Sequence, residues 1–233
     1  MSRNVAIVGA TGAVGQELLS ILEERNFKLD SLKLLASTRS AGRKVKFRGE
    51  ELTIEELTHD SFKGVDIVFS SAGAAISQEF LPSAVKAGAV CIDNTSFYRM
   101  DPNVPLVVPE VNPEDIKLYK PEFGGKGIIA NPNCTTIMMV VVLNPINKIS
   151  KIKKIHISSY QSASGAGAVA MEELKQQYKD IIETGTTTHI AKFPHQLAYN
   201  VIPQIDKMTD NGYTKEEMKM FNETRKIMHS DVR

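Results

Sequence analysis

Val5-Ala6-Ile7-Val8-Gly9-Ala10-Thr11-Gly12-Ala13-Val14-Gly15 gives the clearest indication of how this chain folds. A short apolar run ends in three glycines, each separated from the next by two residues, and apolar residues at helical spacing follow. A dinucleotide site requires this order of strand, glycine turn and helix, because glycine permits close phosphate approach and the helix start offers free N–H groups. We assign cofactor contacts to Gly9, Thr11, Gly12, Ala13, Val14 and Gly15; a purely structural turn is the alternative.

Short apolar runs recur at residues 32–37, 65–71 and 89–94, and each indicates a strand. Between them, Gln16–Arg25 and Glu79–Ala87 place apolar residues at helical spacing. Strands that alternate with helices indicate βαβ units and a parallel sheet. The predicted fold class is therefore α/β, with a Rossmann-type dinucleotide-binding domain over residues 1–130.

The pattern changes near residue 130, where GGKGIIANPNCTT leads into an apolar helix. Ile155–Ser159 then reads as a strand, and Met171–Glu183 and Thr214–Met228 read as exposed amphipathic helices. We predict a second, α+β domain over residues 131–233. Nothing after the last helix closes a sheet, so we expect this domain to be incomplete and the chain to be truncated.

Composition narrows the classes of partner. With 28 basic and 27 acidic residues the net charge is +1, which provides no broad field to attract nucleic acid or an anionic membrane. The longest apolar run, Ile137–Leu143, falls far short of the roughly 20 residues that span a bilayer, and we expect no membrane contact. Two widely separated cysteines indicate a reducing compartment, so we expect a cytoplasmic protein. No metal site is assigned.

The end of the second apolar run bears on the choice of cofactor. Ser37-Thr38-Arg39-Ser40 stands where NAD enzymes carry an acidic residue for the ribose 2′-hydroxyl, and hydroxyls with Arg39 suit a 2′-phosphate, so we predict NADP. The alternative is a solvated basic loop that includes Arg43 and Lys44. After the third run, Ser71-Ala72-Gly73 puts small residues at a carboxyl end, where ligands of parallel sheets bind, although a simple tight turn fits them too.

Cys134 is the candidate nucleophile, because Asn131-Pro132-Asn133-Cys134-Thr135-Thr136 places it just before an apolar helix. The helix dipole stabilises a thiolate by about 1 kcal/mol, too little to ionise most thiols at neutral pH, so a basic partner is needed. None of the five histidines lies in a motif that marks it as that partner. A buried, inert cysteine is the alternative for Cys134, and it is what we predict for Cys91 inside an apolar run.

With these residues assembled, the whole chain closely resembles the bacterial aspartate-semialdehyde dehydrogenases. The matching segments are VAIVGATGAVGQELL, ASTRSAGR, FSSAG, IDNTSFYRMD, VPLVVPEVN, NPNCTT, SYQSASGAG, FPHQLAYNVIPQID and YTKEEMKM with ETRKI. The NPNCTT motif separates the chain from acylglutamyl-phosphate reductases and from glyceraldehyde-phosphate dehydrogenase, whose cysteine motifs differ. The resemblance implies that residues 131–233 form a catalytic and dimerisation domain, and that the full-length protein is a homodimer or a dimer of dimers.

The same resemblance implies a reaction. Cys134 attacks aspartate semialdehyde, hydride leaves to NADP, and inorganic phosphate releases the acyl-enzyme as aspartyl phosphate. In biosynthesis the reaction runs backwards, and it supplies lysine, threonine and methionine.

The resemblance also implies roles for single residues. Gln161 orients the reacting group, Arg99 and Lys219 hold phosphate, and Glu216 meets the substrate's amino group. Asn133 is a further candidate for the phosphate site, and Ser164 and Gly165 match the stretch that approaches the nicotinamide. A dianionic acyl phosphate needs fixed cations, although Arg99 and Lys219 taken singly are typical of solvated surface charges.

The chain departs from the family at its end, because the family's catalytic histidine and a substrate-carboxylate arginine lie beyond the position of Arg233. We therefore expect these 233 residues alone to be inactive or nearly so. Two alternatives remain open: another acyl-phosphate reductase, such as the acylglutamyl type, and a non-catalytic NADP-binding relative.

Overall fold

The computed structural model describes residues 3–232, which form two compact units. Of the described residues, the first unit comprises 3–155 and 219–232, and the second comprises 156–218. The apolar helix after Cys134 therefore belongs to the same unit as the glycine turn. The predicted domain boundary at residues 130/131 stays a prediction.

The first unit contains a seven-stranded sheet in the order β3-β4-β2-β1-β5-β6-β7. All neighbouring strands are parallel except β3 and β4. The strands are β1 Asn4–Val8, β2 Ser31–Ala36, β3 Lys44–Phe47, β4 Glu50–Glu56, β5 Ile67–Ser70, β6 Val90–Asp93 and β7 Ile128–Ala130. This arrangement confirms the predicted α/β class, and β1, β2, β5 and β6 match the four predicted strands.

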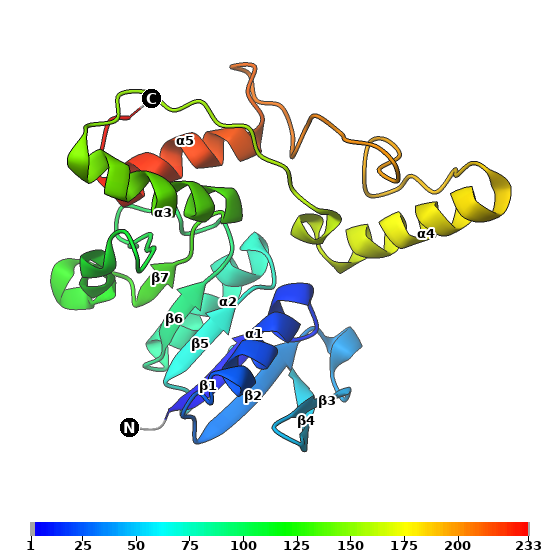
Figure 1. Cartoon of the computed structure of the whole chain (residues 1–233). Helices are drawn as coiled ribbons and strands as arrows, with labels where there is room; N and C mark the ends of the chain where they lie inside the picture. The colour runs from blue at the N-terminus through cyan, green and yellow to red at the C-terminus, as the bar shows by residue number, and fades with distance from the viewer. Residues whose placement is uncertain (1–2, 233) are drawn as a thin grey trace. The chain divides into compact units, whose positions relative to one another are not determined.

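Helices cover both faces of the sheet. Helix α1 (Ala13–Glu24) packs on one face and α2 (Ala74–Lys86) on the other (Figure 1). Alternate residues of β1 reach opposite faces, because Ile7 joins the core cluster of α1 whereas Ala6 and Val8 join that of α2. Burial on both faces explains why the strands read as continuous apolar runs.

Two further helices pack together in the first unit, α3 (Cys134–Ile149) and the later part of α5 (Lys215–Met228). Val140 of α3 and Ile227 of α5 are both buried in the core cluster on the α2 face of the sheet. The short 3-10 helices are η1 Thr38–Ser40, η2 Pro113–Tyr119 and η3 Pro121–Phe123. A hydrogen bond from the Asn133 backbone N–H to Glu223 also holds α5 against the start of α3, across 90 positions of the chain.

The second unit contains η4 (Ala163–Ala166), α4 (Ala168–Thr184) and the first residues of α5. The strand predicted at Ile155–Ser159 is wrong, because these residues lie in irregular, exposed backbone without a ladder partner. Within residues 156–218 the structure shows one isolated bridge, Met208 to Thr214, and no named strand. The helices predicted at 171–183 and 214–228 are confirmed as α4 and α5.

No helix among residues 3–232 is both long and apolar enough to cross a membrane. The same residues contain no group of three or more His, Cys, Asp or Glu that would hold a metal ion.

Candidate active site

The glycine turn connects β1 to α1 at the carboxyl end of the sheet. Gly9 has φ +88°, and a Cβ there would lie 3.0 Å from the carbonyl group of Ser71 in the turn after β5. A Cβ on Gly15 would lie 2.3 Å from the Gly9 carbonyl oxygen, and one on Gly12 would lie 3.3 Å from it. Each glycine therefore removes volume where two backbone segments approach closely.

The start of α1 is suited to an anion. Gly12 is its N-cap, no side chain bonds to the cap, and the first turn has no acidic residue. The first helical N–H groups have no intrahelical acceptors, and the dipole adds positive potential at this end. Because a close backbone approach and an uncapped helix start coincide here, the residues present fit the pyrophosphate of a dinucleotide.

Ser37, Thr38 and Arg39 follow β2 and are exposed, whereas Ser40 is buried. The Thr38 hydroxyl donates to Glu56 Oε1 at 2.5 Å, and Glu56 is the last residue of neighbouring β4. A 2′-phosphate bound by Thr38 would have to displace this exposed carboxylate. Between this edge and the glycine turn lies a cavity of about 540 Å³, lined by Thr11, Gln16, Arg43, Lys44, Val45, Lys46 and Ile54.

The predicted contacts after β5 lie beside the glycine turn. Ser71 and Ala72 contact the position where a Gly9 Cβ would stand, and Gly73 has φ +101° as the N-cap of α2. The Ser71 hydroxyl also accepts a hydrogen bond from Asn94 Nδ2 at 3.2 Å. The structure therefore brings these candidates together with residues 9–15, as the parallel-sheet argument predicts.

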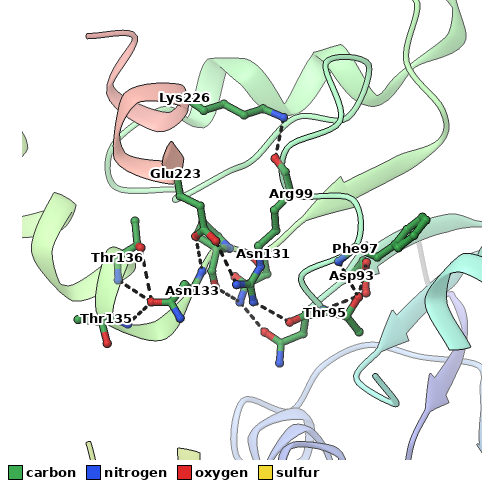
Figure 2. A network of polar contacts seen from close by, with 12 residues as sticks. Asp93, Thr95, Phe97, Arg99, Asn131, Asn133, Thr135, Thr136, Glu223 and Lys226 are labelled. Atoms are coloured by element: carbon green, nitrogen blue, oxygen red, sulfur yellow. Dashed lines mark hydrogen bonds and ion pairs between the residues drawn. The ribbon is translucent and has the colours of Figure 1, made fainter. Parts of the chain in front are cut away.

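Cys134 is the first residue of α3, and its side chain is exposed. Asn133 caps the helix: its Oδ1 accepts from the backbone N–H of Thr135 at 3.0 Å and of Thr136 at 3.2 Å (Figure 2). These two N–H groups therefore bond the cap and are not offered to the Cys134 thiol. The Asn133 side-chain oxygen serves the helix as its cap.

Cys91 is buried in β6 with 0% of its surface exposed, which confirms its predicted burial. Burial raises the pKa of its thiol to about 12, and the nearby Asp93 carboxylate adds to that rise. The buried alternative for Cys134 is wrong, because its side chain reaches the surface.

Arg99 lies in the buried network drawn in Figure 2. Its Nε donates to Asn131 O at 2.9 Å, its Nη2 to Asn94 O at 3.0 Å, and its Nη1 to Glu223 Oε1 at 3.2 Å. The surface-charge reading of Arg99 is therefore wrong. Its guanidinium bonds directly to the loop that leads to Cys134.

Glu223, on α5, is a site residue that the sequence analysis missed. Its Oε2 accepts the backbone N–H of Asn133 at 2.6 Å, so one carboxylate bonds both Arg99 and the helix cap (Figure 2). Burial raises the pKa of the Glu223 carboxyl, and Arg99, the Asn133 N–H and Lys219 act against that rise. A signal was present in the sequence, because Glu216, Lys219, Glu223 and Lys226 recur at helical spacing.

Lys219 belongs to the first unit, one helical turn before Glu223, and its charge acts on that carboxyl. Glu216 is buried on the same helix but belongs to the second unit. The structure thus brings Arg99, Lys219 and Asn133 together around Glu223. The role of Glu216 toward the substrate stays a prediction.

Gln161, Ser164 and Gly165 lie together in the second unit. A Cβ on Gly165 would lie 2.4 Å from Gln161 Cδ, so the glycine makes room for the glutamine side chain. Ser164 Oγ lies 2.6 Å from Ser162 Oγ in the same turn, η4. Their predicted roles toward Cys134 and the nicotinamide stay predictions.

The two histidines of the first unit have partners away from the cysteine loop. His59 stacks on Phe80 and its Nδ1 lies 2.8 Å from Ser83 Oγ. His229 Nε2 lies 2.8 Å from a carboxylate oxygen of Asp115. Neither geometry marks a general base for Cys134.

The fold and the site define a dinucleotide-binding protein with an exposed cysteine at a helix start, beside a buried arginine. Residues 4–119 match the semialdehyde dehydrogenase NAD-binding domain, and residues 143–232 match the semialdehyde dehydrogenase dimerisation domain. The chain belongs to the aspartate-semialdehyde dehydrogenase family.

Relatives and solved structures support this assignment. Aspartate-semialdehyde dehydrogenase of Aquifex aeolicus is 55% identical over 99% of this chain and 67% of its own length. The Bacillus subtilis enzyme is 53% identical over 97% of this chain and 65% of its own length. Aspartate semialdehyde dehydrogenase II of Vibrio cholerae, solved with ASA, superposes with a TM-score of 0.95 at 46% identity, over 99% of this chain and 67% of that one. The chain thus spans about two thirds of the length of these relatives.

A more distant structure also matches, the enzyme of Candida albicans solved with NADP. Its TM-score is 0.70 at 27% identity, over 98% of this chain and 60% of that one.

Proposed function

We propose that the whole protein is an NADP-dependent aspartate-semialdehyde dehydrogenase that forms a thioacyl intermediate on Cys134. The observation that carries the proposal is the exposed Cys134 thiol at the start of α3, next to a loop that Arg99 holds. Membership of the family supports the substrate class. The acylglutamyl alternative is not retained, because the relatives described above are aspartate-semialdehyde dehydrogenases.

In the oxidative direction, the Cys134 sulfur bonds to the aldehyde carbon of the semialdehyde, and the carbonyl oxygen takes a proton. Bound NADP would supply the acceptor for the hydride that leaves this carbon, and the hydroxyl proton of the hemithioacetal is released as the thioester forms. The resulting thioester is cleaved when a phosphate oxygen attacks the same carbon, and the sulfur departs as thiolate with aspartyl phosphate as product. Arg99 and Lys219 hold the phosphate, because fixed cations stabilise its charge.

The cofactor proposal rests on the first unit. The turn at residues 9–15 supports the pyrophosphate, and Ser37, Thr38, Arg39 and Ser40 support the 2′-phosphate. The Candida relative was solved with NADP, which agrees with this choice. Ser71, Ala72 and Gly73 lie beside the turn, and we propose that Ser164 and Gly165 approach the nicotinamide.

The proposal also includes a homodimer. Residues 143–232 match a dimerisation domain, and α3 exposes Met138, Val142 and Ile149 at 60%, 62% and 90%. Exposed apolar side chains at helical spacing are typical of a surface that a partner covers.

The test is phosphate-dependent formation of NADPH from aspartate semialdehyde by the whole protein. We expect Cys134→Ser to abolish the reaction and Cys91→Ala to retain it, because Cys91 is buried and inert. If the two variants retain equal activity, the nucleophile is not Cys134. If the wild-type protein binds NADP but forms no NADPH, the chain belongs to a non-catalytic relative.

A further inference from the structure

We propose that Glu223 is a positioning residue for Arg99, the cation that binds phosphate, and for the loop that carries the nucleophile Cys134. This inference rests on the proposed function. Glu223 touches neither the cofactor turn nor Cys134 by any contact described above. It acts through Arg99 and Asn133, which it joins with a single carboxylate (Figure 2).

Both carboxylate oxygens of Glu223 act as hydrogen-bond acceptors. Oε1 receives the Arg99 guanidinium at 3.2 Å, and Oε2 receives the Asn133 backbone N–H at 2.6 Å. Only 2% of the Glu223 residue surface is exposed, so water does not substitute for either donor. An amide at this position would accept on one oxygen and present its own N–H groups to the second donor.

The Glu223 carboxylate also fixes the orientation of the Arg99 guanidinium. A guanidinium has five N–H donors, and three of them bond to Glu223, Asn94 and Asn131. Within residues 3–232 the other two N–H groups of Arg99 make no hydrogen bond, which leaves them for an anion. The buried guanidinium cannot turn to another direction while its three acceptors hold it. Glu223 thereby preorganises the cation before phosphate arrives.

The same helix also holds the backbone that carries Arg99. Lys226, one turn after Glu223, donates from Nζ to three carbonyl oxygens: Arg99 at 2.8 Å, Asp101 at 2.7 Å and Val104 at 2.7 Å. Figure 2 draws the first of these bonds. Helix α5 thus holds the arginine by its side chain through Glu223 and by its main chain through Lys226.

The first experiment uses inorganic phosphate as the probe. Cys134 is alkylated with uncharged iodoacetamide at increasing phosphate concentration, and the rate at each cysteine is followed by peptide mass spectrometry. We expect phosphate to protect Cys134 in the wild-type chain. In Glu223→Gln the concentration for half-protection rises roughly tenfold or more, because a charge-assisted contact of the site is lost.

The matched control is Glu79→Gln, which makes the same substitution at an exposed position of α2 that has no ion pair among the described contacts. We expect phosphate to protect Cys134 in this variant at the same concentration as in the wild type. Glu223→Asp keeps the charge but shortens its reach, and we expect intermediate protection. This variant also serves if Glu223→Gln fails to fold. Wild-type half-protection in a folded Glu223 variant overturns the inference.

A second measurement tests the positioning without phosphate. In a ¹H–¹⁵N spectrum, the backbone amide resonance of Asn133 reports its hydrogen bond to the Glu223 carboxylate. We expect this resonance to move upfield in Glu223→Gln and to keep its position in Glu79→Gln. An unmoved resonance overturns the positioning role. If phosphate fails to protect the wild-type chain while the resonance moves, the proposed phosphate site is wrong and the positioning of the nucleophile loop stands.

Discussion

The absence of a Cβ atom matters to a different degree at each glycine of the turn. Gly9, Gly12 and Gly15 look alike in the sequence, but the space around each differs in the structure. Gly9 needs a positive φ and Gly15 needs the absence of a Cβ, whereas Gly12 has φ −75° and a Cβ there would make one tight contact of 3.3 Å with the Gly9 carbonyl oxygen. The three positions therefore tolerate substitution to different degrees.

We predict that Gly15→Ala abolishes NADP binding and lowers the free energy of unfolding by roughly 1–3 kcal/mol, because its Cβ meets a backbone oxygen that cannot move alone. Gly12→Ala should weaken NADP binding less and lower the free energy of unfolding less. Thermal melts and fluorescence titration with NADPH measure the two effects. Equal losses in the two variants would contradict this account of the turn.

Arg39 tests the choice of cofactor. We predict that Arg39→Ala weakens NADP binding by roughly tenfold to a hundredfold and leaves NAD binding nearly unchanged, because in the proposed site Arg39 contacts the 2′-phosphate, which NAD lacks. Arg3→Ala is the matched control, since this exposed arginine precedes the amino end of β1, whereas Arg39 follows the carboxyl end of β2. Calorimetric titration with each cofactor decides, and an equal loss for both would remove Arg39 from the 2′-phosphate site.

Sequence reasoning at this scale found the cysteine and the arginine but not how they are joined. The partners of Arg99 lie at residues 94, 131 and 223, and separations of 32 and 124 positions leave no local pattern. Burial of Cys91 was predictable because its neighbours in the strand are apolar. Burial of Arg99 depends on acceptors that only the folded chain supplies.

At the scale of elements, strong periodicity predicted the parallel strands and the helices, whereas weak patterns failed. The β3–β4 hairpin was missed, although Arg48 at φ 52° and Gly49 at φ 82° form the two-residue turn that suits a twisted hairpin. β7 has three residues, too few for a pattern. The strand predicted at 155–159 has the right composition but no partner, and a strand is stable only when paired.

Glu173 on α4 gives the second unit a dependence on pH. It is buried, and it accepts backbone N–H bonds from Ala191 at 3.1 Å, Phe193 at 3.3 Å and Lys192. Burial alone would raise the pKa of this carboxyl, but the bonds from Lys192, Phe193 and Ala191 outweigh it and hold the pKa below its usual value.

A lowered carboxyl pKa contributes stability that is present above the usual glutamate range, about pH 4.3, and is lost as pH falls through the folded value. We predict that the amides of residues 191–193 lose their protection from hydrogen exchange below about pH 4. Glu173→Gln should remove this dependence, whereas exposed Glu172→Gln should keep it. Unchanged acid sensitivity in Glu173→Gln would contradict the assignment.

At the scale of the whole molecule, the exposed apolar side of α3 bears on assembly. We predict that Val142→Lys lowers the fraction of dimer at micromolar protein, because a charge is costly in a covered apolar surface. Ile116→Lys, at a 48% exposed apolar position in η2, should leave assembly unchanged. Light scattering after size exclusion measures both, and a wild-type protein that stays monomeric at every concentration would refute the dimer.

The most direct test of the central claim is to trap the acyl group on its sulfur. The whole protein is incubated with aspartate semialdehyde and NADP in the absence of phosphate, and its peptides are analysed by mass spectrometry. We expect an aspartyl thioester on the peptide containing Cys134, formed with one equivalent of NADPH and released when inorganic phosphate is added. NADPH formation without an adduct at Cys134, or an adduct that phosphate does not release, would contradict it.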